Sequence, residues 1–411
     1  MQQLCIVSFD EALERSLALA TQEPSTQWVG LLESLGRVLG KEILCCKNLP
    51  SYNNAAMDGF AFAHANIHSQ LRIKKRILAG ETLSSCLEKD ECYKIMTGAQ
   101  VPSDADTIVP FERCTFYDEE SVRVPLDIKK GNALRIKGEE QRVGTSLAQK
   151  GEKIDASMIA LFASQGITHV EVYRKVSIVV LSTGDELKKP WEKANEDQIY
   201  DINAFAIIAL LKEQGFDAHY GGVVPDDLDA AIAYFGAMKA YDVVVTSGGV
   251  SMGEADFVEK ALVANGFESS FHGINIKPGK PTMFGKMGQT LLSSLPGNPL
   301  AAYVNAFVFL IPMLRKREGA LKAQFDFVTA INETNLTLKS GRVNLVLGQC
   351  CKGRFKAFDD NNYGSGMIMP LVKSNCILVS DENTQSIEAG KEVKIIIFKS
   401  FSSKTIEHLK N

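Results

Sequence analysis

The stretch "VVVTSGGVSMGEADF", from Val243 to Phe257, joins three features that together indicate a fold class. Its apolar start is typical of a strand that is buried on both faces, as strands of parallel sheets are. Gly248 and Gly249 follow, and glycine lets the backbone turn sharply and approach a ligand closely. Free backbone N–H groups at the start of the next helix favour a phosphate or another oxyanion. The stretch therefore predicts a strand, a ligand-binding loop and a helix.

Strand and helix patterns alternate on both sides of this stretch. "KVSIVVLSTGDEL" (175–187) has the pattern of a strand that ends in glycine and acids, and "YDINAFAIIALLKEQG" (200–215) has the pattern of a helix that Gly215 ends. Repeated units of this kind, with nearly continuous apolar strands, indicate a parallel sheet covered by helices on both faces. We predict a multidomain protein in which residues 175–317 form this α/β domain.

The flanking segments have other patterns. Residues 44–131 contain short strand-like pieces separated by turn residues, which predicts a β-rich module, and residues 318–411 predict a C-terminal β-domain. The helical stretch "DASMIALFASQGI" (155–167) can pair with the helix expected near the N-terminus. We therefore expect residues 1–43 and 132–174 to form one linking domain, and 411 residues suit the roughly two to four domains of a chain this long.

Composition excludes several classes of partner. The chain is 45% hydrophobic and 23% charged with a net charge of -4, so it has no general attraction to nucleic acid or anionic lipid. The N-terminal stretch lacks the pattern of a signal peptide, and Ser8 with Glu11 predicts a capping box. The apolar run 301–314 is shorter than the roughly 20 residues that a membrane helix needs. With nine scattered cysteines, we expect a soluble cytoplasmic protein with free thiols.

Three loops follow predicted strands of the α/β domain: "STGDEL" (182–187), "TSGGVSMGEADF" (246–257) and "SLPGNP" (294–299). Ligands of open α/β sheets bind beyond the carboxyl ends of the strands, so these loops should share one edge. A lone glycine pair would indicate only a turn, whereas three such loops together favour a binding site. Pro296 and Pro299 stiffen the third loop, and Pro299 suits the first turn of a helix.

Charged residues close to these loops suggest the chemistry of the ligand. Five acids are expected at the same edge, namely Glu186, Asp226, Asp227, Glu254 and Asp256. Carboxylates beside phosphates indicate a shared Mg²⁺ or proton transfer, although Asp227 or Glu254 taken alone also suits a helix cap. Lys277 and Lys280 in "INIKPGKPTMFG" suit a small tetrahedral anion or a phosphate, with solvated surface lysines as the alternative.

Seven motifs, in this order over nearly the whole chain, resemble those of the MoeA family of molybdopterin molybdenumtransferases, which includes the E domain of gephyrin: "AAMDGFA", "IMTGAQVP", "LRIKGEE", "STGDEL", "SGGVSMGEADF", "IKPGKP" and "LPGNP". The resemblance implies an elongated homodimer with four domains per subunit, a MogA/MoaB-like α/β domain and a C-terminal β-barrel-like domain. It implies molybdenum cofactor biosynthesis, in which molybdate is inserted into adenylylated molybdopterin with Mg²⁺-dependent release of AMP. A MogA-like molybdopterin adenylyltransferase and molybdoenzyme maturation partners would act before and after it.

The resemblance also implies roles for individual residues. The expected catalytic residues are Asp58, Glu140, Glu186 and Asp256, and the expected metal ligands are Glu186, Asp227 and Asp256. The expected substrate-binding residues are Thr97, Arg135, Ser247, Gly248, Gly249, Lys277, Lys280, Pro296, Gly297, Asn298, Pro299 and Ser365. Asp58 and Thr97 would reach a cleft formed with the partner subunit, and Ser365 would come to the site from the terminal domain.

The chain departs from the family pattern at three places. Glu140 stands where the family commonly has Asp, Ala301 where it usually has Ser, and Leu347 where it typically has Arg. A hydroxyl and a guanidinium suited to an oxyanion are thus missing, which predicts weak molybdate binding. A non-catalytic dimeric scaffold of the gephyrin type and an adenylyltransferase or nucleotide hydrolase are the alternatives. The retained acids favour the enzyme over the scaffold, and "AAMDGFA" argues against the third reading.

Overall fold

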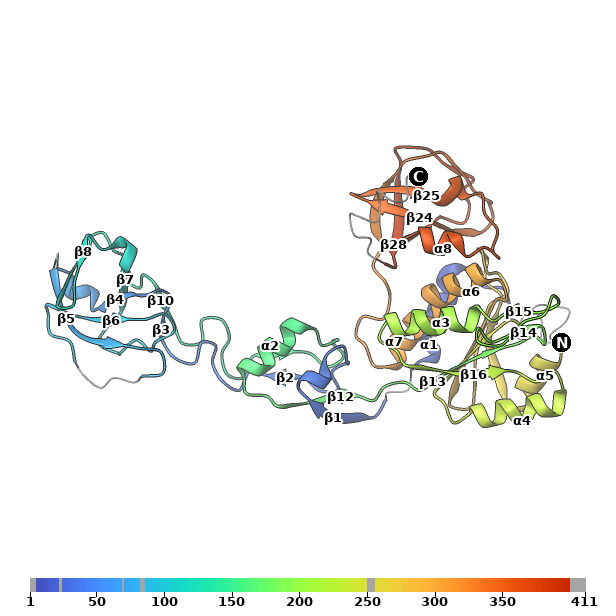
Figure 1. The fold of residues 1–411 in the computed structure, drawn as a ribbon, viewed down its shortest axis with the longest axis horizontal. Helices are drawn as coiled ribbons and strands as arrows, with labels where there is room; N and C mark the ends of the chain where they lie inside the picture. Colours follow the sequence, from blue (N-terminus) through green and yellow to red (C-terminus); the bar gives the residue numbers. More distant parts are fainter. Residues whose placement is uncertain (1–4, 22–23, 69, 82–85, 250–255, 400–411) are drawn as a thin grey trace.

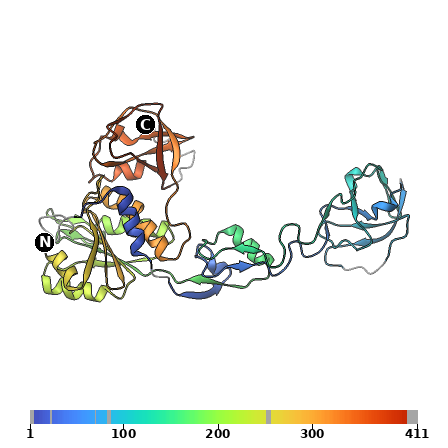
Figure 2. The same cartoon turned by 180° about the vertical axis from the view of Figure 1, so that it is seen from behind.

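The computed structural model describes residues 5–21, 24–68, 70–81, 86–249 and 256–399. The molecule is elongated: a β-rich module lies at one end, a small linking unit in the middle, and the α/β domain with the C-terminal domain at the other end (Figure 1). The view from behind shows the same separation (Figure 2). Among the described residues, no helix combines the length and the apolar character needed to cross a bilayer.

The α/β domain contains the parallel sheet that the sequence predicts. Its six strands lie in the order β16 (Ala218–Val223), β13 (Ile178–Ser182), β17 (Val243–Ser247), β21 (Thr290–Leu295), β20 (Met283–Met287) and β18 (Phe267–His272). The first four are parallel, and the last two add an antiparallel edge. The carboxyl ends of β13, β17 and β21 therefore lie next to one another.

Helices cover both faces of this sheet. Ile178 and Val180 belong to a core shared with α3 (Asn203–Glu213), α6 (Pro299–Asn305) and α7 (Ile311–Arg317). Val179 and Leu181 belong to the opposite core, with α4 (Leu228–Met238) and α5 (Asp256–Ala264). Successive strand residues point to opposite faces, so a strand that is covered twice is mostly apolar, and the few polar residues of β17 and β21 are buried as well. This explains the continuous apolar runs in the sequence.

Helix α1 (Phe9–Leu19) packs against the α/β domain. Ser8 accepts a hydrogen bond from the Glu11 N–H at 3.2 Å, as the capping pattern predicts. The Phe9 ring lies 5.5 Å from that of Phe309, and the Val7 N–H donates to Gly273. The expectation that this helix pairs with α2 (Ala156–Ser164) is wrong, because its apolar side is buried in the core of the α/β domain.

The linking unit is built from two distant segments. β1 (Thr26–Gly30) pairs with β12 (His169–Tyr173), and β2 (Ile43–Leu44) pairs with β11 (Ser146–Ala148). Helix α2 packs Phe162 into their shared core. The β-rich module contains a sheet in the order β7 (Thr107–Pro110), β4 (Gly59–Phe62), β6 (Glu91–Ile95), β5 (Gln70–Ile77), β9 (Ser121–Arg123) and β8 (Phe116–Tyr117). Beside this sheet, β3 (Asn54–Ala55) pairs with β10 (Leu134–Arg135).

The C-terminal domain is a closed five-stranded barrel, in agreement with the predicted β-domain. Its order is β24 (Val343–Cys351), β25 (Arg354–Ala357), β22 (Val328–Asn332), β28 (Glu392–Ile397) and β26 (Cys376–Val379), and β26 pairs with β24 again. β19 (Ile276–Lys277) of the α/β region also pairs with β24. This pairing attaches the loop that carries the two expected lysines to the barrel.

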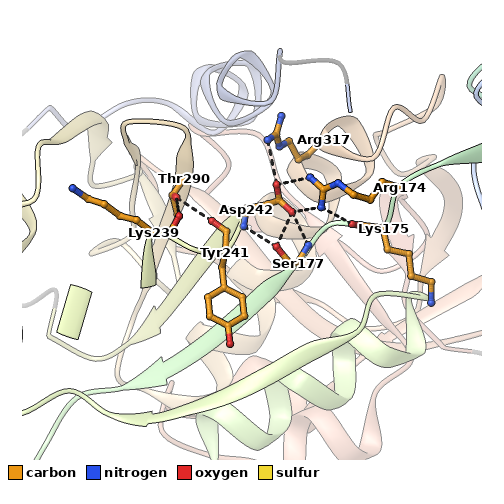
Figure 3. A network of polar contacts seen from close by, with 8 residues as sticks. All are labelled: Arg174, Lys175, Ser177, Lys239, Tyr241, Asp242, Thr290 and Arg317. Atoms are coloured by element: carbon orange, nitrogen blue, oxygen red, sulfur yellow. Dashed lines mark hydrogen bonds and ion pairs between the residues drawn. The ribbon is translucent and has the colours of Figure 1, made fainter. Parts of the chain in front are cut away.

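Asp242, just before β17, contacts the segment that enters the α/β domain, before β13, and the end of α7, where the chain leaves it (Figure 3). Its carboxylate accepts hydrogen bonds of 2.8 Å from both terminal nitrogens of Arg174, which lies between β12 and β13, and one of 2.7 Å from the Ser177 hydroxyl. Arg317, the last residue of α7, approaches to 3.5 Å. Burial opposes ionisation of Asp242, but the hydrogen bonds from Arg174 and Ser177 outweigh it and hold its pKa well below the usual range.

Candidate functional site

A cavity of about 940 Å³ lies at the carboxyl ends of β13, β17 and β21, where the three strand-end loops were expected to meet. Seven expected site residues line it: Glu186, Ser247, Gly248, Gly249, Gly297, Asn298 and Pro299. The sheet brings them together because neighbouring parallel strands end at the same edge.

The glycine loop after β17 packs directly on the loop after β13. Gly248 and Gly249 have φ angles of +85° and +68°, which side chains other than glycine rarely adopt. A Cβ atom on Gly248 would lie 2.6 Å from the Thr183 hydroxyl oxygen. The Thr183 N–H donates to the Ser247 carbonyl at 3.2 Å. Glycine is therefore required here for the close approach of the two loops as well as for the turn.

Asn203, the first residue of α3, joins the loops after β17 and β21. Its Nδ2 donates to the Ser247 hydroxyl at 2.8 Å and to the Gly297 carbonyl at 2.7 Å. Its buried Oδ1 has no hydrogen-bond partner among the described residues. No local sequence signal indicates this role of Asn203, because its two partners lie 44 and 94 residues away in the chain.

Two neighbouring carboxylates line the large cavity in addition to Glu186. They are Asp185 and Asp226, and the charge of Asp185 raises the pKa of Asp226. Like charges held this close favour a cation between them or a shared proton. Carboxylate oxygens are also the donors that Mg²⁺ prefers. The residues present in this part of the cavity are therefore suited to a magnesium ion.

The structure does not place Asp227 in the lining of this cavity. Asp227 caps α4, and its carboxylate accepts a hydrogen bond from the Ala230 N–H at 2.8 Å. The neighbouring Asp226, which was also expected at this edge, lines the cavity. Glu254 lies outside the described residues, as does the side chain of Asp256, so the described residues place neither carboxylate. Within the described part of the chain, no three His, Cys, Asp or Glu residues form a metal-binding group.

A second cavity, of about 340 Å³, lies between the α/β domain and the barrel. Four expected site residues line it together with Asn298: Lys277, Lys280, Pro296 and Ser365. Arg342 adds a third cation, and the lining residues within the described part of the chain include no Asp or Glu. A cavity with several cationic side chains and no acid suits a small oxyanion.

Arg342 and Tyr363 of the terminal domain were not expected at the site. The Arg342 Nε is buried and has no hydrogen-bond partner among the described residues. The Tyr363 hydroxyl accepts a hydrogen bond from the Leu347 N–H at 2.7 Å, and burial raises the pKa of Tyr363 to about 12. Tyr363 thus stays neutral and keeps its hydroxyl proton for donation. The Gly-Arg pair at 341–342 was visible in the sequence, but the place of Arg342 depends on how the barrel docks.

The departures from the family pattern have different surroundings. Ala301 lines the second cavity, so a hydroxyl at this position would face it. Leu347 is fully buried in the main hydrophobic core and lines neither cavity. The expectation that an arginine at position 347 would face the anion is therefore wrong for this chain, in which only the backbone of Leu347 supports the cavity, through Tyr363.

Asn298 joins the two cavities. It lines both of them, and its Nδ2 donates to the Ser365 hydroxyl at 3.0 Å. The Leu300 N–H donates to the Ser365 carbonyl at 3.1 Å. The terminal domain thus brings Ser365 to the end of the third loop, and the cavities adjoin at this point.

The remaining expected residues lie in or beside the β-rich module, at the far end of the same chain (Figures 1 and 2). Asp58 accepts hydrogen bonds of 2.6 Å from the Thr97 hydroxyl and from the Thr97 N–H, and these bonds lower the pKa of Asp58. Arg135 forms ion pairs of 3.0 Å with Glu139 and 3.4 Å with Glu140. Within one chain, the structure does not bring these residues to either cavity.

Comparisons with known proteins agree with this architecture. Family profiles match residues 7–166 (MoeA N-terminal region, domain I and II), 179–316 (probable molybdopterin binding domain) and 329–398 (MoeA C-terminal region, domain IV). The chain is 30% identical to a molybdopterin molybdenumtransferase of Haemophilus influenzae, over 95% of this chain and 98% of that protein. It is 28% identical to one of Nostoc, over 91% and 89%.

Solved structures are similar over nearly the whole chain. A molybdopterin biosynthesis MoeA protein from Pyrococcus horikoshii superposes with a TM-score of 0.79 at 27% identity, and the match covers 96% of this chain and 100% of that one. Another structure of a MoeA protein from this organism gives a TM-score of 0.82 at 24% identity, over 95% and 100%. The similarity extends through the linking unit and the β-rich module as well as the α/β domain.

Proposed function

Because this chain belongs to the MoeA family of molybdopterin molybdenumtransferases, which are transferases of molybdenum cofactor biosynthesis, we propose that it inserts molybdate into adenylylated molybdopterin with Mg²⁺-dependent release of AMP. The observation that carries this proposal is the contrast between two adjoining cavities. Among the residues that the structure describes, the larger is lined by acids and by strand-end loops, and the smaller by cations without acids. Such a pair of cavities suits a metal-bound nucleotide beside a small oxyanion.

The larger cavity takes the adenylylated substrate. Its volume of about 940 Å³ lies in the range of sites for ligands with several rings, and the backbone N–H groups of the glycine loop suit phosphate oxygens. Asp185 and Asp226, together with phosphate oxygens of the substrate, would hold Mg²⁺, which supplies positive charge to those phosphates, and Glu186 lines the same cavity. Asn203 keeps the loops around the substrate in place through Ser247 and Gly297. We retain Asp256 as an expected catalytic residue of this cavity.

The smaller cavity takes molybdate. Lys277, Lys280 and Arg342 offset the charge of the dianion, and the Tyr363 hydroxyl is available to donate a hydrogen bond. Because Asn298 lines both cavities, molybdate here lies beside the substrate in the larger one. Ala301 offers no hydroxyl, and we expect molybdate binding weaker than in relatives with serine at this position.

A second copy of the chain completes the site in this proposal. Asp58 and Thr97 form a hydrogen-bonded pair at the far end of the molecule, so only another subunit can bring them to the cavities without a large rearrangement. The linking unit carries large exposed apolar side chains that suit an interface with such a copy. They are Trp28, Leu32, Leu35 and Leu44.

The reaction also defines the kinds of partner. A MogA-like adenylyltransferase has to supply the adenylylated substrate, and molybdoenzyme maturation partners receive the product. We place the reaction in the cytoplasm, in keeping with nine cysteines that form no disulfide in the structure. The scaffold alternative is not favoured, because the chain matches nearly the whole length of relatives that are named as transferases.

The proposal is tested by measuring AMP release from purified adenylylated molybdopterin. We expect release to require Mg²⁺ and to increase when molybdate is added, with tungstate as a second anion. A variant with Lys277→Ala and Lys280→Ala should lose the response to molybdate but still bind the substrate. Absence of AMP release by the wild type under all these conditions would overturn the proposed reaction.

A further inference from the structure

Asn305 is a buried polar residue in apolar surroundings. It is the last residue of α6, it is 0% exposed, and its neighbours Val304 and Ala306 belong to the main hydrophobic core. A buried amide costs free energy unless it is hydrogen-bonded. Neither the helix nor the proposed reaction requires a polar side chain at this position, so its contacts indicate what it does.

The contacts of Asn305 are with the loop that carries the two lysines of the smaller cavity. Its Nδ2 donates to the Gly279 carbonyl at 2.8 Å and to the Thr282 hydroxyl at 2.5 Å. The Thr282 hydroxyl donates in turn to the Gly279 carbonyl at 2.8 Å. This triangle of hydrogen bonds fastens the loop containing Lys277 and Lys280 to α6.

The loop backbone lies directly on the Asn305 amide. Gly279 has a φ angle of +95°, and a Cβ atom at this position would lie 2.2 Å from the Asn305 Nδ2. Immediately after Asn305, residues Ala306–Leu310 form a π-helical turn. Such turns are rare and occur frequently at functional sites. The helix is thus locally irregular where it supports the lysine loop.

The opposite end of α6 forms another wall of the same cavity. Asn298, Leu300 and Ala301 line it there, and the lysine loop faces them. We propose that Asn305 is a positioning residue of the oxyanion site, which sets the place of Lys277 and Lys280 relative to this wall. Charge-assisted hydrogen bonds are short and directional, so displaced lysines bind a small dianion less tightly. The inference rests on the proposed function, because the lysines that Asn305 positions are those of the proposed molybdate site.

Two substitutions test this inference. Asn305→Leu removes both donated hydrogen bonds at similar volume, and Thr282→Val removes only the hydroxyl that joins Asn305 to Gly279. Thr290→Val is the matched control, since Thr290 is also buried in the α/β domain but donates to Tyr241 at 2.9 Å, at the start of β21. We expect Asn305→Leu to raise the molybdate concentration for half-maximal insertion about tenfold, the value of roughly one good hydrogen bond. The KM for adenylylated molybdopterin and the kcat at saturating molybdate should change less than about twofold.

Direct titration of molybdate by calorimetry separates failure of this inference from failure of the proposed function. If the wild type and the Lys277→Ala, Lys280→Ala variant bind molybdate equally, the proposed anion site itself is wrong. If the lysine variant loses binding but Asn305→Leu and Thr282→Val bind as Thr290→Val does, only the positioning role of Asn305 is overturned. Should Asn305→Leu fail to fold, Thr282→Val decides, because weaker molybdate binding in that variant supports the role and unchanged binding refutes it.

Discussion

The backbone N–H of Leu347 donates a hydrogen bond of 2.7 Å to the hydroxyl oxygen of Tyr363. The hydroxyl accepts this hydrogen bond and keeps its own proton for donation, and Tyr363 is one of the residues that line the smaller cavity. The side chain of Leu347 points away into the core. A strand position where the resemblance to the family implied an arginine therefore supports the site of this chain through its backbone.

Tyr363→Phe should weaken molybdate binding without affecting the adenylylated substrate. The variant lacks the donated hydrogen bond, so we expect the molybdate concentration for half-maximal insertion to rise by about fivefold to tenfold. The unfolding free energy should fall by about 1 kcal/mol, because the Leu347 N–H loses its acceptor. A molybdate titration of AMP release and thermal unfolding measure the two effects. An unchanged molybdate dependence would show that the hydroxyl does not reach the anion.

Ala301→Ser and Leu347→Arg should behave differently, although the resemblance to the family implied both of the introduced residues. Ala301 lines the smaller cavity, so serine should lower the molybdate concentration needed for half-maximal insertion. Arginine at position 347 would place an unpaired charge in the core, and we expect about 3–5 kcal/mol of lost stability. Denaturant unfolding and molybdate titration of each single variant check this pair. A stable Leu347→Arg variant with tighter molybdate binding would contradict the observed orientation.

Asp226→Ala and Asp227→Ala should separate a metal role from a capping role in adjacent residues. Asp226 lines the larger cavity, so its loss should raise the Mg²⁺ concentration needed for half-maximal AMP release about tenfold. Asp227→Ala should leave that concentration unchanged and lower the unfolding free energy by about 1 kcal/mol, the usual cost of a lost N-cap. Magnesium titrations and thermal melts of both proteins are the measurements. The assignment fails if the two effects are exchanged.

Mixed dimers should regain activity when the two defects lie in different subunits. Asp58→Ala and Glu186→Ala homodimers are each expected to be inactive. A dimer with one subunit of each kind would keep one intact site, in which unaltered Asp58 and Glu186 come from different chains. Co-expression with two affinity tags yields the mixed dimer, and AMP release measures its activity. Purified mixed dimers without activity would rule out a shared site.

Asp242→Asn should lower stability in a way that depends on pH. The hydrogen bonds from Arg174 and Ser177 depress the pKa of Asp242, so the native state favours its ionised form. Its contribution is fully present above the unfolded pKa of about 3.9 and is lost as pH falls through the lower folded value. We expect a deficit of about 3 kcal/mol at pH 7 that narrows below about pH 4.

Thermal melts across this pH range test the Asp242 prediction. The control is Asp217→Asn, because Asp217 forms a more exposed pair with Lys175 at 2.7 Å and should cost less than about 1 kcal/mol. A deficit of equal size at pH 3 and pH 7 would show that the charge of Asp242 contributes nothing.

Local sequence patterns were sufficient to predict the strands and loops that surround the site. The apolar runs at 178–181 and 243–245 specify strands that are covered on both faces, and the glycine pair at the end of the second strand specifies a tight loop. Parallel strands then have to end at one edge, so the three strand-end loops meet without further information. The capping of α1 by Ser8 was likewise readable, because its partner lies only three residues away.

Tertiary structure alone decided which side chains face the two cavities. Adjacent loop residues such as Asp226 and Asp227 point in different directions, and their order in the sequence does not show which one faces the ligand. Arg342 and Tyr363 reach the smaller cavity because the barrel docks on the α/β domain. Helix α1 likewise becomes buried only because it packs on the core of the α/β domain, which is distant from it in the sequence. These placements depend on contacts between segments distant in the chain, whereas local patterns specify only which faces have to be covered.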